Sequence, residues 1–292
     1  MLHAEVSFHL KTAGIPVLHI KGPTVALWLY PDGGRDWGDV DVLVAPHRIE
    51  EALSVLEAAG LTERFSGVGR RATTDHAVTL ARTDPEIGGD EVDVHDRFPG
   101  LDGEAEKAFR VLWRRREPGR LAHVDVWFPD LSTRALLVVL NSARTRSPKA
   151  QTDLDRLLSE TVEVDWEDVL DLARRLGALT GLRAGLELHP AGEALVAGCE
   201  LANVPVSTAW RLVLADAPRT ALRLDELARL PWRRKVPAVA HWLLPPPAVL
   251  RMRDPTLGSG GFAVAVGYVR RLCDGMRALP ASVRAIRAGK RS

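Results

Sequence analysis

Hydrophobic and polar positions alternate along this chain with two different periods, and their order predicts its elements. Apolar residues over 2–13 recur every three to four positions, the spacing of an amphipathic helix, whereas residues 16–20 form a short apolar run typical of a strand. Further helices are expected over 23–30 and 47–59, and further strands over 39–44, 77–81 and 91–95. This succession of strands and helices predicts a compact α/β domain in the first part of the chain.

After about residue 129 the pattern changes, and helical spacing dominates. It recurs over residues 131–144, 152–160, 166–176, 179–188, 206–215, 221–230 and 262–279. Ser132, Thr152 and Asp165 have the side chains expected of N-caps, while the proline-rich stretch 236–254 gives no clear assignment. The sequence therefore predicts an α+β protein with a sheet-containing domain over 1–129, a helical domain over 130–280 and a flexible basic tail over 281–292.

The composition narrows the class of protein. The 292 residues carry a formal net charge of +1, which argues against a nucleic-acid coat or a membrane-surface binder. The two cysteines, Cys199 and Cys273, form no CxxC pair, which argues against a disulfide framework or a structural zinc site. No apolar run reaches the ~18 residues of a membrane span, and the beginning of the chain lacks the features of a signal peptide. We therefore expect a cytoplasmic protein without a membrane partner.

The stretch from Gly34 to Val44, GRDWGDVDVLV, carries the first candidate chemistry. Successive side chains of a strand point to opposite faces, so Asp39 and Asp41 are expected to share one face while Val40 and Val42 face a core. Two carboxylates on one strand face repel each other unless a cation lies between them. Mg²⁺ binds one or two carboxylates together with the oxygens of a phosphate substrate, so this pair is a candidate magnesium site.

Other residues accompany this stretch in a fixed order. Lys21-Gly22 ends the first apolar strand, Arg35 precedes the acid pair, and Val92-Asp93-Val94-His95 forms a later strand with an acid and a histidine. In this order, over roughly residues 10–190, the chain resembles the bacterial uncharacterised nucleotidyltransferase family, a branch of the polymerase-β-type nucleotidyltransferases. The resemblance implies a polymerase-β-like N-terminal catalytic domain, with a mixed sheet and flanking helices, and a mostly helical C-terminal domain that binds the substrate.

The resemblance also implies a two-metal site for phosphoryl transfer. Asp39 and Asp41 are expected to ligate two Mg²⁺ ions together with a third carboxylate from a neighbouring strand. One ion would orient a nucleoside triphosphate, with ATP the commoner donor in the superfamily, and the other would activate the acceptor hydroxyl. Asp93, which lies between two valines, matches the family position of the third acid. Asp125 has the same setting and is the alternative.

The remaining candidates concern phosphate binding and proton transfer. His95 shares the expected face of the third acid, where it either contacts the acceptor, orients that acid, acts as a base or is a histidine hydrogen-bonded at a strand end. Lys21 and Gly22 replace the Gly-Ser of the superfamily; Gly22 permits close approach of a phosphate, and Lys21 supplies positive charge. Arg35, in the same turn as Gly38, is either placed for a bidentate phosphate contact or is a solvated surface arginine.

The leading hypothesis is a Mg²⁺-dependent nucleotidyltransferase that moves a nucleoside monophosphate from an NTP to a hydroxyl or similar group of a small molecule or peptide, releasing pyrophosphate. A non-catalytic module that keeps the fold and binds a nucleotide or peptide is the alternative, because Lys-Gly replaces Gly-Ser. Transfer to RNA ends is a third possibility, raised by the basic clusters Arg114–Arg116 and Trp232–Lys235. Such runs are usually solvated, so a nucleic-acid acceptor is not favoured.

Overall fold

The computed structural model of the chain describes residues 2–63, 76–84, 88–159, 162–254, 256–258 and 260–291. The chain forms two compact units. The described residues up to 204 form the sheet unit, and the described residues from 205 onward form the helical unit.

In the sheet unit, helices and strands are interspersed up to residue 129, and the described elements that follow are helices. In chain order they are α1 (Leu2–Thr12), β1 (Val17–His19), α2 (Pro23–Leu29), β2 (Val40–Val44), α3 (Ile49–Ala58), β3 (Thr62–Glu63), β4 (Ala77–Asp84), β5 (Gly88–His95), α4 (Ala105–Arg114), β6 (Arg116–Leu121), β7 (Val124–Pro129), α5 (Leu131–Thr145), α6 (Pro148–Leu157), α7 (Trp166–Leu176), α8 (Leu179–Leu186) and α9 (Pro190–Ala197). Short 3₁₀ turns lie at Pro46–Arg48 and Glu200–Asn203.

The main sheet is mixed and has the strand order β1–β2–β5–β4–β3. β2 pairs in parallel with β5, and the other pairings in this sheet are antiparallel. A parallel neighbour requires a long crossover, and here the connection from β2 to β5 includes α3, β3 and β4. β6 and β7 form a separate antiparallel pair. The predicted α+β class with a mixed sheet is confirmed.

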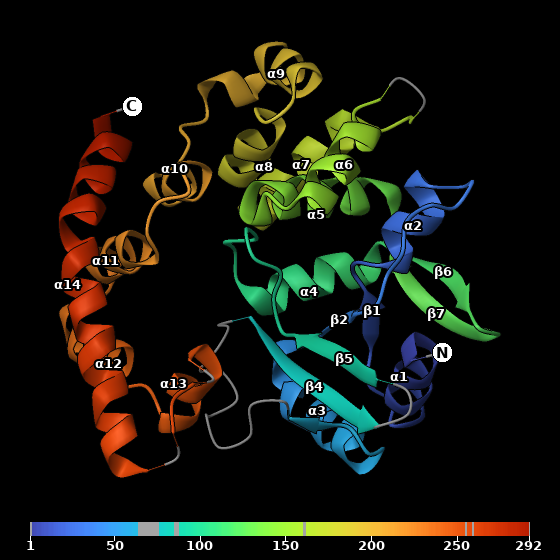
Figure 1. Cartoon of the computed structure of the whole chain (residues 1–292). Helices are drawn as coiled ribbons and strands as arrows, with labels where there is room; N and C mark the ends of the chain where they lie inside the picture. Colours follow the sequence, from blue (N-terminus) through green and yellow to red (C-terminus); the bar gives the residue numbers. More distant parts are fainter. Residues whose placement is uncertain are drawn as a thin grey trace. The chain divides into compact units, whose positions relative to one another are not determined.

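Strand alternation gives the main sheet one apolar face. Val40, Val42 and Val44 of β2 and Val92 and Val94 of β5 are all fully buried, in one core with leucines of α1 and α3. Figure 1 shows these two helices on the same side of the sheet. Because a shift of one residue would expose every valine of a strand, this core fixes the register of β2 against β5.

Helix α5 packs against both earlier and later helices of the sheet unit. Its Ala135, Leu136 and Leu140 are fully buried, and the helix packs against α6, α7 and α8 as well as α2. The compact unit therefore extends to Val204, whereas the sequence placed a domain boundary near residue 129. The change of pattern at that point marks where strands give way to helices, and the packing continues through it.

The helical unit contains α10 (Thr208–Leu214), α11 (Arg219–Arg229), α12 (Trp232–Leu243), α13 (Pro247–Arg253) and α14 (Gly261–Arg291). α14 continues through Arg291, so the end of the chain that was predicted as a flexible tail is helical up to that residue. α12 and α13 occupy the proline-rich stretch that gave no clear assignment. A cavity of about 690 Å³ lies within this unit, lined by residues of α11, α12 and α14 that include Leu224, Leu243 and Leu272.

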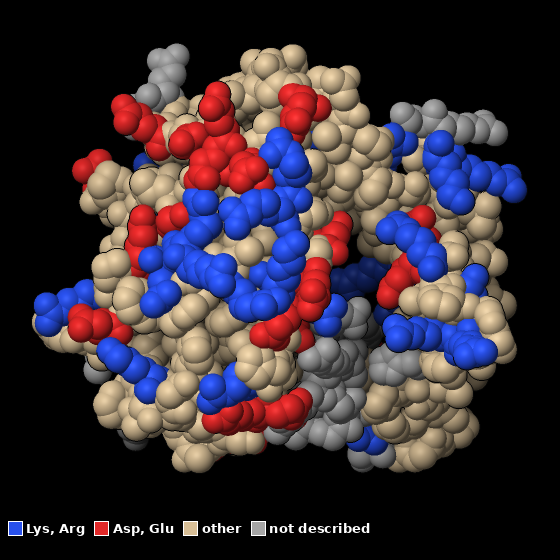
Figure 2. All heavy atoms as spheres, turned by 180° about the vertical axis from the view of Figure 1, so that it is seen from behind, with Lys and Arg blue, Asp and Glu red and all other residues tan. Residues whose placement is uncertain are grey.

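The surface mixes charges of both signs. On the face seen in Figure 2, a band of Lys and Arg side chains is bordered by Asp and Glu side chains. Oppositely charged side chains also form ion pairs within the sheet unit. Nε of Arg115 lies 2.7 Å from Oδ2 of Asp130, and Arg115 also pairs with Asp168. None of the helices in the described ranges is long and apolar enough to cross a membrane.

Candidate functional site

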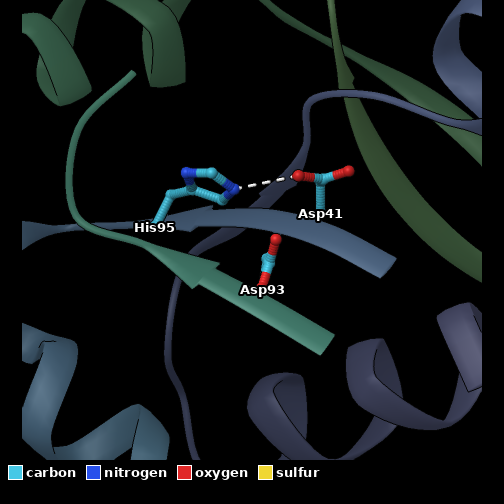
Figure 3. A group of neighbouring side chains, drawn as sticks. All are labelled: Asp41, Asp93 and His95. Carbon is cyan, nitrogen blue, oxygen red and sulfur yellow. Dashed lines mark hydrogen bonds and ion pairs between the residues drawn. The ribbon is translucent and has the colours of Figure 1, made fainter. Parts of the chain in front are cut away.

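Asp41, Asp93 and His95 meet on the face of the sheet that lies opposite the valine core. The parallel register aligns Asp41 with Asp93 and Leu43 with His95. Figure 3 shows the three side chains on neighbouring strands, with His95 directed at Asp41. The same alternation that buries the valines therefore places two carboxylates and an imidazole together, although the two strands are far apart in the sequence.

These three side chains have the spacing of a metal site. Each offers one ligand atom, and the atoms lie within 4.8 Å of one another. Oδ2 of Asp41 and Oδ2 of Asp93 have no hydrogen-bond partner among the described residues. Two such carboxylate oxygens fit a hard divalent cation such as Mg²⁺ or Mn²⁺, which prefers oxygen ligands.

Asp41 is a buried carboxylate whose ionised form is stabilised by two neighbouring side chains. The Nζ of Lys21 donates to Oδ1 of Asp41 at 2.6 Å, and Nε2 of His95 lies 2.9 Å from the same oxygen. Burial by itself raises the pKa of Asp41, but the hydrogen bond with His95 and the charge of Lys21 outweigh it, so the pKa lies well below its ordinary value. Asp41 is therefore ionised at neutral pH.

Asp93 is half-buried and is positioned from the other side of its strand. Its antiparallel partner on β4 is Thr79, whose Oγ1 donates to Oδ1 of Asp93 at 2.6 Å. The alternative third acid, Asp125, lies on β7 opposite Arg120 in the separate two-stranded sheet. The acid that the fold places beside Asp41 is thus Asp93, and its role as a metal ligand stays a prediction.

Asp39 lies outside this group. β2 begins at Val40, so the strand alternation that was expected to align Asp39 with Asp41 stops one residue short. Asp39 and Gly38 are both exposed in the turn before the strand. A Cβ built on Gly38 would meet no atom within 4 Å, so packing does not require glycine there. A contribution of Asp39 to a metal site stays a prediction.

Gly22 forms a tight turn between β1 and α2. Its φ of 61° lies in the left-handed region that favours glycine. Its carbonyl accepts hydrogen bonds from the backbone N–H groups of Val25 and Ala26 at the start of α2, and from Nη1 of Arg35 at 3.1 Å. This turn carries Lys21 to the edge of the acid pair.

Arg35 is engaged with a carboxylate of the protein itself. Its Nε and Nη2 donate to the two oxygens of Asp153 on α6, each at 2.7 Å, and the hydroxyl of Tyr30 donates to Oδ1 of Asp153 at 2.9 Å. Burial, together with the hydrogen bond to Asp153, raises the pKa of Tyr30 to about 12. We call this group the Arg35–Asp153 clamp. The phosphate contact predicted for Arg35 would require these bonds to break.

A buried histidine pair lies next to the Lys21-Gly22 turn. Nδ1 of His3 is 3.1 Å from Nδ1 of His19, and Oγ of Ser7 is 2.6 Å from Nε2 of His19. Burial lowers the pKa of His3 to about 4 and, with the charge of His3, lowers the pKa of His19 to about 3. Both rings are therefore neutral at neutral pH, and they connect α1 to β1 by hydrogen bonds.

Two further residues near the site were missed by the sequence reasoning. Arg144, on α5, has a guanidinium that interacts electrostatically with both Asp41 and Asp93. Its Nη1 lies 3.4 Å from Nε2 of His76, whose ring stacks on His95 with centroids 5.6 Å apart. Nε of Arg144 is buried without a hydrogen-bond partner among the described residues. No local motif marks Arg144, because it stands at the end of an otherwise ordinary helix.

The family model of the uncharacterised nucleotidyltransferases matches residues 4–191. This span covers the whole sheet with both acid-bearing strands and the helices up to the start of α9. The chain therefore belongs to the uncharacterised nucleotidyltransferase family. A nucleotide substrate and transferase chemistry are what this family implies.

Among solved structures, the chain is similar to an antigenic nucleotidyltransferase-like protein from Paracoccidioides brasiliensis. The two are 16% identical with a TM-score of 0.41, and the match covers 66% of this chain and 91% of the other. No curated protein matches the chain.

Proposed function

We propose that this protein is a divalent-metal-dependent nucleotidyltransferase. In this proposal a nucleoside monophosphate moves from an NTP, with ATP favoured by analogy with the superfamily, to a hydroxyl or similar group of a small molecule or peptide, and pyrophosphate leaves. The observation that carries the proposal is the parallel pairing of β2 with β5, which sets Asp41 beside Asp93. Membership of the family supports the reaction class.

Asp41 and Asp93 are the residues that would hold the metal, and Asp39 in the adjacent turn is a further candidate ligand. A bound Mg²⁺ would supply the positive charge that orients the triphosphate and lowers the pKa of the attacking hydroxyl. His95 keeps Asp41 in place through its hydrogen bond, which is a positioning role. Thr79 does the same for Asp93 from β4.

The triphosphate would be bound by groups that surround the acid pair. The backbone of the Gly22 turn is the candidate phosphate contact in this proposal, while Lys21 is bonded to Asp41. Arg144 has donors that no carboxylate of the described chain accepts by a hydrogen bond, so we assign it to the β- and γ-phosphates. Arginine suits this role because its planar donors match phosphate oxygens in pairs.

The test compares three carboxylates. The whole protein is incubated with Mg²⁺, a mixture of hydroxyl acceptors and ATP radiolabelled on the α-phosphate, and label transfer and pyrophosphate release are measured. Asp41→Asn and Asp93→Asn should abolish metal-dependent transfer, whereas Asp125→Asn, the matched control on the other sheet, should retain it. Unchanged turnover in Asp41→Asn would refute the assignment.

A non-catalytic nucleotide-binding module is the second candidate, and one observation favours it. Lys21 donates to Oδ1 of Asp41 at 2.6 Å, so a cationic side chain already neutralises the central acid. Calorimetric titration with ATP, with and without Mg²⁺, separates the two. Metal-dependent binding followed by pyrophosphate release supports the transferase, and metal-independent binding without turnover supports the module.

Transfer to RNA receives less support from Arg114–Arg116, the first of the two basic clusters that raised it. Arg115 pairs with Asp130 and Asp168. The guanidinium of Arg116 lies over the rings of Trp113 and Trp127, at 4.2 and 4.6 Å from their centroids. Two of the three arginines of this cluster are therefore engaged inside the protein. Labelling of bulk tRNA in the same assay would reverse this ranking.

A further inference from the structure

We propose that Lys21 is a built-in cation of the site, which takes one of the two cation positions at Asp41 and leaves room for a single divalent ion. This inference rests on the proposed function and departs from the two ions that the superfamily resemblance implies. It assigns Lys21 to the carboxylate of the protein instead of the triphosphate. Lys21 is in this sense a positioning residue for Asp41.

The hydrogen bonds of Asp41 support this role. In two-metal sites the ions lie about 3.5–4 Å apart and act as a clamp on the reacting oxygens, and a carboxylate between them must offer an oxygen to each. Oδ1 of Asp41 is already bonded by Nζ of Lys21 at 2.6 Å and by Nε2 of His95 at 2.9 Å. Among the described residues, only Oδ2 of Asp41 remains for a metal, and Oδ2 of Asp93 has no hydrogen-bond partner there either.

The backbone holds Lys21 in this position. The N–H of Ile20 donates to the carbonyl of Asp41 at 3.1 Å, so the residue before Lys21 is fixed to the acid-bearing strand. The side chain of Lys21 is 21% exposed, and its Nζ lies 6.0 Å from the centroid of the Phe98 ring. Gly22, in its left-handed conformation, turns the chain immediately afterwards. The lysine is therefore packed against the site and does not extend into solvent.

The ligand acids support a single ion as well. Asp39, the ligand that a second ion would be expected to use, is exposed and outside the group. Asp41 and Asp93 together carry two negative charges. In the nucleotide-free site, where Lys21 and Arg144 lie beside these acids, one divalent ion already exceeds their charge, and a second would meet repulsion from the other cations.

The experiment uses Mn²⁺ as the probe, because it suits the same oxygen ligands as Mg²⁺ and is paramagnetic. Calorimetric titration of the full chain should give one Mn²⁺ per molecule. Electron paramagnetic resonance spectra should show no exchange-coupled Mn²⁺ pair, with or without a non-hydrolysable ATP analogue. In Lys21→Met the first ion should bind about ten-fold more tightly, since Asp41 loses a positive neighbour, and a coupled pair should appear with the analogue.

Two further variants complete the design. Lys21→Arg keeps the charge and should keep the single ion. Lys11→Met removes an exposed lysine at the end of α1 and should behave as the wild type; near-ultraviolet circular dichroism checks the fold of each variant. A coupled pair in the wild type that Lys21→Met leaves unchanged would overturn the role of Lys21 and leave the transferase proposal standing. Failure of the wild type to bind Mn²⁺ under either condition would overturn both.

Discussion

Asp41 and Asp153 are both buried aspartates of the sheet unit that bind a cationic side chain, but their oxygens are used differently. Asp153 has partners on both oxygens, from Arg35 and Tyr30. Asp41 has both of its partners on Oδ1, and Oδ2 has none in the described part of the chain. The two residues are buried to a similar depth, with Asp41 8% and Asp153 4% exposed, but their hydrogen bonding differs.

The difference distinguishes a carboxylate whose hydrogen bonds are complete within the protein from one that can still accept a further ligand. A buried charge is tolerated when its hydrogen bonds are complete, and the Arg35–Asp153 clamp meets that condition. An oxygen left without a donor beside a second acid is stabilised only when a cation binds. We therefore expect Asp41 to matter for activity and Asp153 for stability, and the following measurements test this division.

The largest effect is expected for Asp41→Asn. Metal-dependent turnover should be abolished, because an amide oxygen lacks the charge with which a carboxylate would hold the divalent ion. The shift in melting temperature should be smaller than that of Asp153→Asn, because asparagine can still accept from Lys21 and His95. Steady-state kinetics and calorimetric melting check both points. Full activity of Asp41→Asn, or a larger loss of stability than in Asp153→Asn, would contradict the different roles proposed for the two aspartates.

Asp153→Asn should lower the free energy of unfolding by about 3 kcal/mol, because the buried guanidinium of Arg35 loses its counter-charge. Urea denaturation measures the change. Asp155→Asn, on the same helix but with its side chain 61% exposed, is the control and should change stability by less than about 0.5 kcal/mol. Equal effects of the two variants would contradict the structural role of the clamp.

Acid should destabilise the Asp41 side of the unit through the buried histidine pair. Since the pKa of His19 is lowered from 6.5 to about 3 in the folded protein, the unfolded chain binds more protons between these values. Stability from this group is complete above pH ~6.5 and declines as the pH falls, by about 2 kcal/mol at pH 5. Urea denaturation at several pH values should show a shallower decline for His19→Gln. An unchanged slope would mean that other groups carry the acid sensitivity.

The smallest effect is expected for Tyr30→Phe. It removes one of the three hydrogen bonds of Asp153 and leaves both bonds from Arg35, so the free energy of unfolding should fall by about 1 kcal/mol. Turnover should be unaffected. A loss as large as that of Asp153→Asn would show that Tyr30, and not the ion pair, holds the clamp together.

Much of the fold could be predicted from local pattern. The helices over residues 2–12, 166–176 and 179–186 and the strands β1, β2, β4 and β5 follow from apolar spacing. β3, α4 and the β6–β7 pair were not predicted. Of the three predicted N-caps only Asp165 caps its helix; Asp130 and Ser147 cap α5 and α6. Helix starts are decided by one side-chain bond, and several nearby residues can supply it.

The site was predictable only where strand alternation determines it. The pattern around Asp93 and His95 is enough to place them on one face, but the strand that was expected to include Asp39 begins one residue later. The partner of Arg35 could not be predicted, because Asp153 lies 118 positions further along the chain. The same holds for Arg144, which reaches the acids only through the packing of α5.

The direct pairing of β2 with β5 also makes the centre sensitive to deletion. If one residue were lost between Gly88 and Val92 while the strand kept its place, every later side chain of β5 would change sides. A carboxylate would then enter the valine layer, and a valine would face Asp41. A substitution in β5 changes one side chain and leaves the others on their faces. A deletion of one residue here would disrupt both the core and the proposed metal site.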